Sequence, residues 1–244
     1  MIQGRKERKM PFEFTSRVRY SEVDEDRKLS LTGVINYMQD CSTFQSEDLN
    51  MGIDYLTEKH RAWLLSSWQI IINRYPRFGE EITISTWAHG WKAFFGYRNF
   101  KMEDDNGNVL AYSNTNWIYM NIKTGRPERI PKEISDLYAS EPAIPMQEAS
   151  RKIAPVTEGI SLAPIHVHKY DIDSNNHVNN ERYVPMAMEC LPDGFTIRQL
   201  RVEYRNSAVY GDTIYPLYHQ EGDTLKVSLN DANGKPYAIV EFQS

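Results

Sequence analysis

The chain has 244 residues, 33 of them acidic and 28 basic, which gives a formal net charge of −5, and 41% of the residues are apolar. This length allows one large domain or two small ones, and aromatic residues spread along the chain exclude a disordered or collagen-like protein. No apolar run approaches the roughly 20 residues of a membrane span, and the opening segment lacks the apolar region of a signal peptide. With two cysteines and a slightly acidic balance, the sequence predicts a cytoplasmic protein without a disulfide framework and without general affinity for nucleic acid.

An internal repeat organises the chain. Segment 22–24 precedes segment 171–173 by 149 positions, and segments 34–41 and 183–190 keep the same offset and both end in cysteine. Each copy then contains a run of strands closed by an Asn-Gly pair. Duplication for stability alone is one explanation of the repeat. The other is that the two copies enclose one ligand cleft at their interface.

Each copy predicts one helix followed by strands. Ser30 is a good N-cap, and apolar residues at three- to four-residue spacing predict a helix that ends near Gly52. In the second copy a shorter helix is expected from about Asn180 to Cys190. The expected strands lie at 62–75, 81–91, 94–104 and 108–122 in the first copy, and near 196–206, 212–220, 223–230 and 236–243 in the second.

A long helix followed by an antiparallel sheet is the layout of a hotdog fold, so the repeat predicts an α+β double hotdog. Residues 122–162 contain five prolines without a clear period, which is typical of a linker. The expected domains are a basic tail at 1–9, a first hotdog repeat at 10–121, this linker at 122–162, and a second repeat at 163–244. A homodimer stays open, because a double hotdog already buries the surface that single hotdogs bury by pairing.

The densest polar cluster occupies residues 170–183 and leads into the second helix. Asp173 and His177 carry groups that take or steer a proton, and the amide of Asn175 can donate to a carbonyl oxygen. The start of the helix adds backbone N–H groups that suit a developing oxyanion. The alternative is an Asx-rich turn in which Asn180 caps the helix and His177 is simply exposed.

A comparison of the two copies favours a functional role for this cluster. The first copy has Asp24 at the position of Asp173, but Asp26 and Lys28 replace the asparagine and histidine that follow. Packing alone therefore does not require the full set, and the second copy is the expected catalytic one.

The run Asp171–Asn180 resembles the D-x-N-x-H-V-N-N motif of acyl-acyl carrier protein (acyl-ACP) thioesterases, the plant plastid enzymes and their bacterial relatives. The resemblance extends to residues 63–91, 94–100, 117–131 and 202–212. It implies a double hotdog enzyme that hydrolyses the thioester between a fatty acyl chain and the phosphopantetheine arm of acyl carrier protein. It also implies that Asp173, Asn175 and His177 are the active-site residues.

One position departs from the plant pattern. Where plant members have a glutamate proposed as catalytic and then a cysteine, this chain has Ser207 and Ala208. Ser207 is therefore a candidate site position without the carboxylate, and the general base stays open. Asp173 is one candidate; Glu203 is a weaker one, because strand alternation places it on the same face as two arginines, which is typical of a solvated surface.

The substrate-binding residues are expected in the first copy. Its aromatic side chains either belong to the core or line an acyl tunnel, and the candidates for the tunnel are Trp63, Trp68, Trp87 and Phe95. In the second copy, Asn179 and Asn180 beside the motif are also expected to bind substrate. Acyl carrier protein is strongly acidic, so a net-acidic enzyme needs a local basic surface to bind it. Arg182 and Arg198 are the expected docking residues, and the basic tail is the alternative.

No metal and no cofactor are predicted. His166 and His168 lack a third ligand at a recognisable spacing, and the common nucleotide, dinucleotide and serine-hydrolase loops do not occur. Cys41 and Cys190 occupy equivalent helix positions and are expected to pack as small hydrophobic residues. The alternatives to acyl-ACP hydrolysis are an acyl-CoA thioesterase of the hotdog type and a non-hydrolytic acyl-binding protein, which Ser207 favours.

Overall fold

The structure is a computed structural model that describes residues 10–138, 140–173 and 175–244. The predicted basic tail at 1–9 lies outside the described residues. The first repeat contains β1 (Phe12–Arg17), η1 (Tyr20–Glu22), α1 (Leu31–Asp48), α2 (Ile53–Glu58), β2 (Arg61–Ile72), β3 (Glu81–Lys92), β4 (Phe95–Asp104) and β5 (Val109–Asn121). The linker region contains β6 (Arg126–Pro127), α3 (Lys132–Ser135) and β7 (Ile160–Ser161). The second repeat contains β8 (Ile165–His166), η2 (Lys169–Asp171), η3 (Asn180–Arg182), α4 (Tyr183–Met188), β9 (Gln199–Tyr204), β10 (Thr213–Glu221), β11 (Thr224–Asn230) and β12 (Pro236–Gln243).

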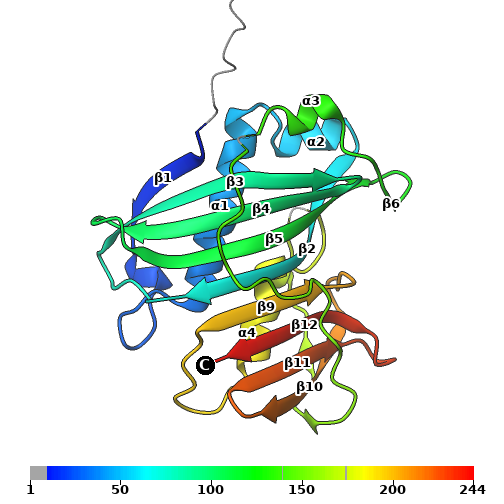
Figure 1. Cartoon of the computed structure of the whole chain (residues 1–244). Coiled ribbons are helices and arrows are strands. Elements are labelled where there is room, and N and C mark those ends of the chain that lie inside the picture. The colour runs from blue at the N-terminus through cyan, green and yellow to red at the C-terminus, as the bar shows by residue number, and fades with distance from the viewer. Residues whose placement is uncertain (1–9, 139, 174) are drawn as a thin grey trace, which may run out of the picture.

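The strands form one antiparallel sheet with two equivalent halves. Read from its outer edge, each half has the corresponding strands in the same order. The main path runs β1-β3-β4-β5-β2 and then β9-β12-β11-β10-β7, so each strand in one half of the path has a counterpart at the mirrored place in the other half, with β7 of the linker region opposite β1 (Figure 1). The halves join where β2 pairs antiparallel with β9. This architecture is the predicted α+β double hotdog.

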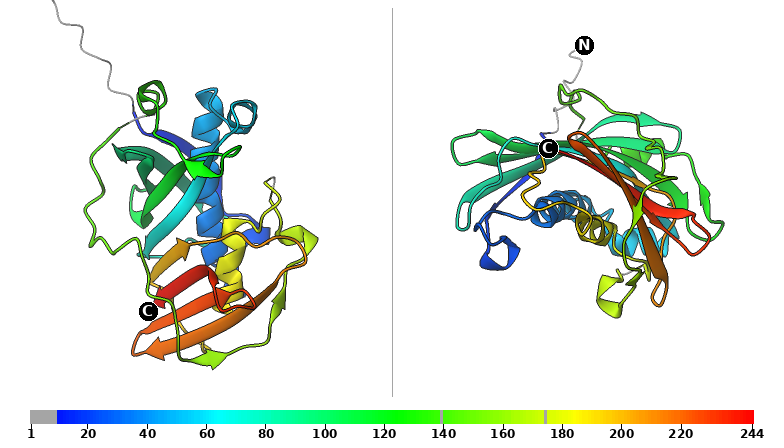
Figure 2. Two further views of the ribbon diagram at one scale, coloured as in Figure 1. Left: turned by 90° about the vertical axis from the view of Figure 1, so that its right-hand side faces the viewer. Right: turned by 90° about the horizontal axis from the view of Figure 1, so that it is seen from below.

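Helices α1 and α4 lie together on one face of the curved sheet (Figure 2). Helix α1 packs on β1, β3 and β4, and α4 packs on β11 and β12. Ser30 begins α1 as predicted, because its hydroxyl accepts a hydrogen bond from the Gly33 N–H at 3.1 Å. No helix in the described part of the chain is both long and apolar enough to cross a membrane.

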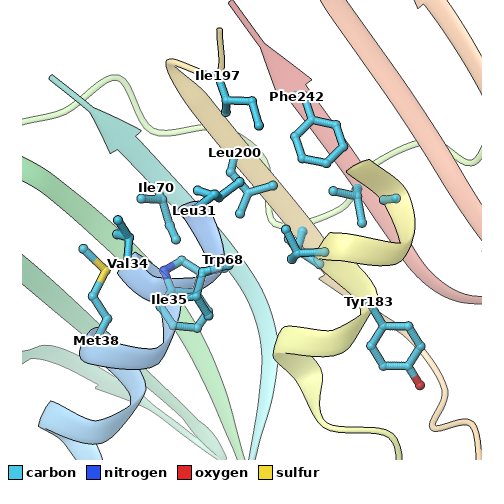
Figure 3. Packing of buried hydrophobic residues seen from close by; sticks show 14 of the residues in the cluster. Leu31, Val34, Ile35, Met38, Trp68, Ile70, Tyr183, Ile197, Leu200 and Phe242 are labelled. Atoms are coloured by element: carbon cyan, nitrogen blue, oxygen red, sulfur yellow. The ribbon is translucent and has the colours of Figure 1, made fainter. Parts of the chain in front are cut away.

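The two repeats share one core across the junction of β2 and β9. Trp68 pairs with Val202 and Ile70 with Leu200, and all four side chains are buried beneath the helices. Figure 3 shows α1 contributing Leu31, Val34, Ile35 and Met38 beside this junction. These residues follow the three- to four-residue spacing from which the helix was predicted. Buried side chains of both repeats belong to one continuous core.

The linker crosses the opposite face of the sheet and is bonded to it. The side-chain amide of Gln69 donates to the carbonyl of Gln147 at 3.0 Å and accepts from the N–H of Ala149 at 3.0 Å. Glu203, which is 5% exposed, accepts a hydrogen bond from the N–H of Ile153 at 2.8 Å. The prediction that Glu203 lies on a solvated face is therefore wrong. The linker covers that face, and the carboxylate holds it in place.

Two helices differ from the prediction at their ends. The first ends at Asp48, and a separate short helix, α2, follows from Gly52, which is its N-cap. The second begins as the 3-10 turn η3 and becomes α-helical only at Tyr183. The break after α1 matters for the site, because residues of α1, of α2 and of the sheet together line the cavity described below.

We expect Leu200→Ala to lower the free energy of unfolding by about 2 to 5 kcal/mol, because it empties a fully buried position at the junction of the repeats. Leu64→Ala is the matched control, since Leu64 is 44% exposed and should cost less than about 0.5 kcal/mol. Urea denaturation followed by circular dichroism measures both. Equal costs for the two variants would show that the junction does not carry the shared core.

Candidate active site

The loop between η2 and η3 holds the three motif residues in a closed turn. The N–H of Asp173 donates to the carbonyl of His177 at 2.8 Å, and the Asp173 carboxylate accepts from the N–H groups of Asn175 at 2.8 Å and His177 at 3.3 Å. Asn176 closes the turn with a φ of 61°, a left-handed conformation that asparagine tolerates. The backbone of the loop is thus fixed by hydrogen bonds around Asp173.

The equivalent loop of the first repeat has the same shape without the same side chains. The N–H of Asp24 donates to the carbonyl of Lys28 at 2.8 Å, and its carboxylate accepts from the N–H of Lys28 at 2.9 Å. Arg27 takes the left-handed position with a φ of 62°. The loop therefore needs an aspartate for its own structure. It does not need Asn175 or His177, whose side chains are exposed.

A cavity of about 250 Å³ opens beside this loop. Its walls come from α1, α2 and strands β2 to β5 of the first repeat, with two residues from the linker region. Among the described residues, Asn175 is the one contribution from the second repeat. The lining residues are Ser42, Thr43, Ser46, Glu47, Gly52, Ile53, Leu56, Thr57, Arg61, Ala62, Trp63, Ala88, Trp91, Gly96, Tyr97, Arg98, Trp117, Ile122, Tyr138 and Asn175.

Aromatic rings form one wall of the cavity. The ring centroids of Trp63 and Trp91 are 6.0 Å apart, and those of Trp91 and Tyr138 are 5.9 Å apart. Adding a Cβ at Gly96 would bring it within 2.8 Å of Trp91, so the strand backbone and these rings are in close contact. Such packed aromatic surfaces suit an apolar ligand, with a few polar groups to orient it.

The sequence interpretation missed the contribution of α1 and α2 to this cavity. Ser42, Thr43 and Ser46 place hydroxyl groups on a helix that otherwise buries apolar side chains. Hydroxyl residues interrupting an apolar stripe were the signal that could have identified this face. Helix α2 had no such signal, because it is too short for a clear periodicity.

Of the four aromatic residues predicted to bind substrate, Trp63 lines the cavity and the other three lie outside it. Trp68 is buried in the core, where its ring stacks with Phe100 at a centroid distance of 5.9 Å. The indole N–H of Trp87 donates to the carbonyl of Pro142 in the linker at 3.0 Å. Phe95 lies against the guanidinium of Arg151, which is 5.3 Å from its ring centroid.

Asn179 and Asn180 have structural contacts. The side chain of Asn179, rather than Asn180, caps the 3-10 turn and accepts from the N–H of Glu181 at 3.1 Å. The carbonyl of Asn180 accepts a hydrogen bond from the hydroxyl of Tyr204 at 3.0 Å. The N–H of Arg182 donates to the carbonyl of Asn179. The N–H groups of Glu181 and Arg182 are thus already bonded, so these two are not free donors for an oxyanion.

Ser207 lies exposed beside the motif loop. Its neighbour Ala208 accepts a hydrogen bond from the N–H of Val178 at 2.9 Å, and the N–H of Ala208 is bonded to the hydroxyl of Tyr183 at 2.9 Å. Within the described residues, no hydrogen bond joins Ser207 to Asp173 or His177. The segment is therefore placed next to the loop but brings no carboxylate to it.

Glu181 is a buried carboxyl group that the sequence interpretation did not single out. Burial raises its pKa, against the opposing effect of the Arg182 charge and of a hydrogen bond with Asn36 on α1. Its Oε2 atom has no hydrogen-bond partner among the described residues. Glu181 is not among the residues that line the cavity.

Neither cysteine has the environment of a nucleophile. Burial raises the pKa of the Cys41 thiol to about 12 and that of the Cys190 thiol to about 11. Both thiols are therefore protonated at neutral pH, and only a thiolate attacks readily. The predicted packing role fits the position of Cys41, whose Sγ lies 3.6 Å from the carbonyl of Ile84.

The two arginines predicted to bind a carrier lie at different ends of the second repeat. Arg182 follows the motif, and its guanidinium is 6.0 Å from the ring of Tyr170. Arg198 precedes β9 and donates to the carbonyl of Asn73 at 2.9 Å. Tyr204, at the far end of β9, is bonded to Asn180. A strand of this length spans about 20 Å, so Arg198 is well separated from the motif loop.

Comparison with known proteins identifies the relatives of the chain. Residues 9–138 match the family model "Acyl-ACP thioesterase N-terminal domain", and residues 156–241 match "Acyl-ACP thioesterase C-terminal domain". The chloroplastic palmitoyl-acyl carrier protein thioesterase of Arabidopsis thaliana is 26% identical over 207 residues, which are 77% of this chain and 50% of that protein. The chain spans about half the length of the curated relatives it matches.

Solved structures share the fold over nearly the whole chain. An acyl-ACP thioesterase from Bacteroides thetaiotaomicron has a TM-score of 0.87 at 23% identity, with 95% of this chain and 96% of that one covered. A Lactobacillus plantarum protein, provisionally described as an oleoyl thioesterase, has a TM-score of 0.84 at 27% identity, with 96% and 95% covered. With both family domains matched in order across a double hotdog, this chain belongs to the acyl-ACP thioesterase family.

Proposed function

We propose that the protein hydrolyses the thioester of fatty acyl-ACP and releases a free fatty acid. The observation that carries this proposal is that Asn175, from the motif loop of the second repeat, lines a cavity built mainly by the first. The acyl chain lies among Trp63, Trp91 and the other lining residues. The thioester then lies at the loop, and the phosphopantetheine arm extends from there to the carrier.

The reaction requires water as the nucleophile. A water oxygen attacks the thioester carbonyl, the C–S bond breaks, and the pantetheine sulfur leaves as a thiol with the proton that the water gave up. The amide of Asn175 donates to the carbonyl oxygen as negative charge develops there. Its Nδ2 atom contacts the Asp173 carboxylate only at 3.4 Å, so little is lost when it turns to a substrate.

Asp173 and His177 orient and activate the water. The Asp173 carboxylate is already held by two backbone N–H groups, which fixes its position and leaves lone pairs for a water molecule. The imidazole of His177 is exposed and has no hydrogen bond within the described residues. It is therefore free to exchange a proton with the water or with the leaving sulfur.

A thiol-release assay with acyl-ACP, acyl-CoA and acyl-pantetheine of several chain lengths tests the function. Turnover with acyl-ACP at a higher kcat/KM than with the other two supports the proposal. Faster turnover of acyl-CoA would make the protein an acyl-CoA thioesterase instead. Tight binding of acyl chains without thiol release would identify a non-hydrolytic acyl-binding protein, the alternative that the absence of a carboxylate at Ser207 favours.

We expect Asp173→Asn to lower kcat by about 100- to 10,000-fold, the usual contribution of a general acid or base, because the amide still accepts the two backbone hydrogen bonds but cannot take a proton. Asp24→Asn is the matched control, since the Asp24 carboxylate accepts the corresponding hydrogen bond from the N–H of Lys28 in the first repeat, and it should keep full activity. Steady-state thiol release measures both. Near-normal activity of the Asp173 variant would reject its role.

For Asn175→Ala the predicted effect is a fall in kcat of about 100- to 1,000-fold with little change in KM, as for other lost oxyanion donors. Asn176→Gly is the control for an unspecific effect of changing the loop. Asn176 has a φ of 61°, which glycine also adopts, so this variant should retain activity. A raised KM at unchanged kcat would make Asn175 a substrate-binding residue only.

The carrier docks beside the motif loop in this proposal. Arg182 and Lys169 both lie over exposed aromatic rings there, Arg182 at 6.0 Å from Tyr170 and Lys169 at 5.7 Å from Tyr210. The His168 ring stacks on Tyr170 with a centroid distance of 5.2 Å. This surface joins positive charge to exposed apolar area, which suits an acidic protein partner better than solvated charge alone.

Reversing the charge at this surface should weaken only the reaction with the protein carrier. We expect Arg182→Glu to raise the KM for acyl-ACP at low salt, with little effect on acyl-pantetheine, because electrostatic attraction acts on the carrier. Arg198→Glu is the control from the other end of β9 and should change neither. An effect of Arg198→Glu equal to that of Arg182→Glu, or equal losses on both substrates, would place the docking surface elsewhere.

A further inference from the structure

Arg98 is a buried cation in the wall of the acyl cavity. It projects from β4 beneath α1, is 8% exposed, and is one of the residues that line the cavity. Its Nη1 atom donates to the side-chain oxygen of Gln45 at 2.6 Å and to the hydroxyl of Thr86 at 2.9 Å. The guanidinium also lies 5.2 Å from the ring centroid of Tyr138. Its position is thus fixed from three sides.

The positive charge of Arg98 has no carboxylate partner among the described residues. Its electrostatic neighbours are Tyr138 and Cys41, and burial lowers its pKa, although an arginine side chain stays protonated in proteins. The two hydrogen bonds from Nη1 go to neutral acceptors. No described residue accepts from Nε or Nη2. A buried charge in this state is unfavourable unless something else bonds to it.

Arg61 provides a contrast in the same cavity. It also lines the wall, but its Nε lies 2.7 Å from Glu128 Oε2, and its Nη2 donates to Glu128 Oε1 at 3.0 Å. The charge of Arg61 is therefore satisfied by the protein. Arg98 is the lining arginine whose remaining donors are left for a ligand.

We propose that Arg98 binds an oxygen atom carried by the acyl chain, so that the cavity prefers acyl groups with a hydroxyl, oxo or carboxyl substituent over plain hydrocarbon chains. This inference rests on the proposed thioesterase function and names its substrate class. A plain chain would place methylene groups against a buried charge and leave its donors unbonded. An oxygen acceptor would complete the guanidinium hydrogen bonds, and sites of this kind discriminate strongly against the analogue that lacks the acceptor.

The test compares acyl-ACP substrates of equal length that differ only in an oxygen substituent, placed at the 3-position in one series and at the chain end in another. In the wild type we expect kcat/KM for at least one oxygenated series to exceed that for the plain chain by about 10- to 100-fold, as for one hydrogen bond to a charged group. Arg98→Met should remove this preference, and Arg61→Met should keep it.

Three results would overturn the inference. A wild-type preference for the plain chain would do so without any variant, even if Arg98→Met failed to fold. Equal losses on all substrates in a folded Arg98→Met variant would show that Arg98 acts on the thioester or on the structure instead. Loss of the preference in Arg61→Met as well would make it a general effect of positive charge. Absence of turnover with every acyl-ACP would instead reject the thioesterase proposal itself.

Discussion

The antiparallel pairing of β2 with β9 is the contact on which the rest of the molecule depends. It turns two five-stranded halves into one sheet and places both helices on the same face. The inner side chains of this junction form the shared core, while Gln69 and Glu203 on the outer side bond the linker. Because the halves are locked in this way, the loop of the second repeat lies against α1 of the first, where the cavity opens.

The pseudo-symmetry of the fold makes the asymmetry of the site informative. Both repeats form the same aspartate-centred loop, yet only the second adds Asn175 and His177. The first repeat has the 18-residue α1 and the additional α2, whereas α4 has six residues. The lining of the cavity therefore comes mainly from the first repeat, whereas the exposed asparagine and histidine of the motif belong to the second.

Much of this arrangement could be predicted from the sequence. The match between the loop and helix segments of the two repeats predicted the fold, because each segment carries the same local pattern, and Ser30 predicted the start of the first helix. Three features could not be predicted. Glu203 is buried only because the linker returns over its strand. Trp63 and Trp68 lie on one face of β2, because the register shifts between Leu65 and Ser67, yet Trp63 lines the cavity and Trp68 packs in the core. Arg98 has no carboxylate partner among the described residues. Each depends on contacts between distant segments.

In the proposed function, one repeat holds the acyl chain and the other cuts the thioester. Photo-crosslinking tests it most directly: a non-hydrolysable acyl-ACP analogue with a diazirine near the chain end is irradiated with the protein, and the labelled peptides are identified by mass spectrometry. The division of labour predicts labels in α1, α2 and strands β2 to β4, whose residues line the cavity. Labels concentrated on α4 and strands β10 to β12 would contradict it.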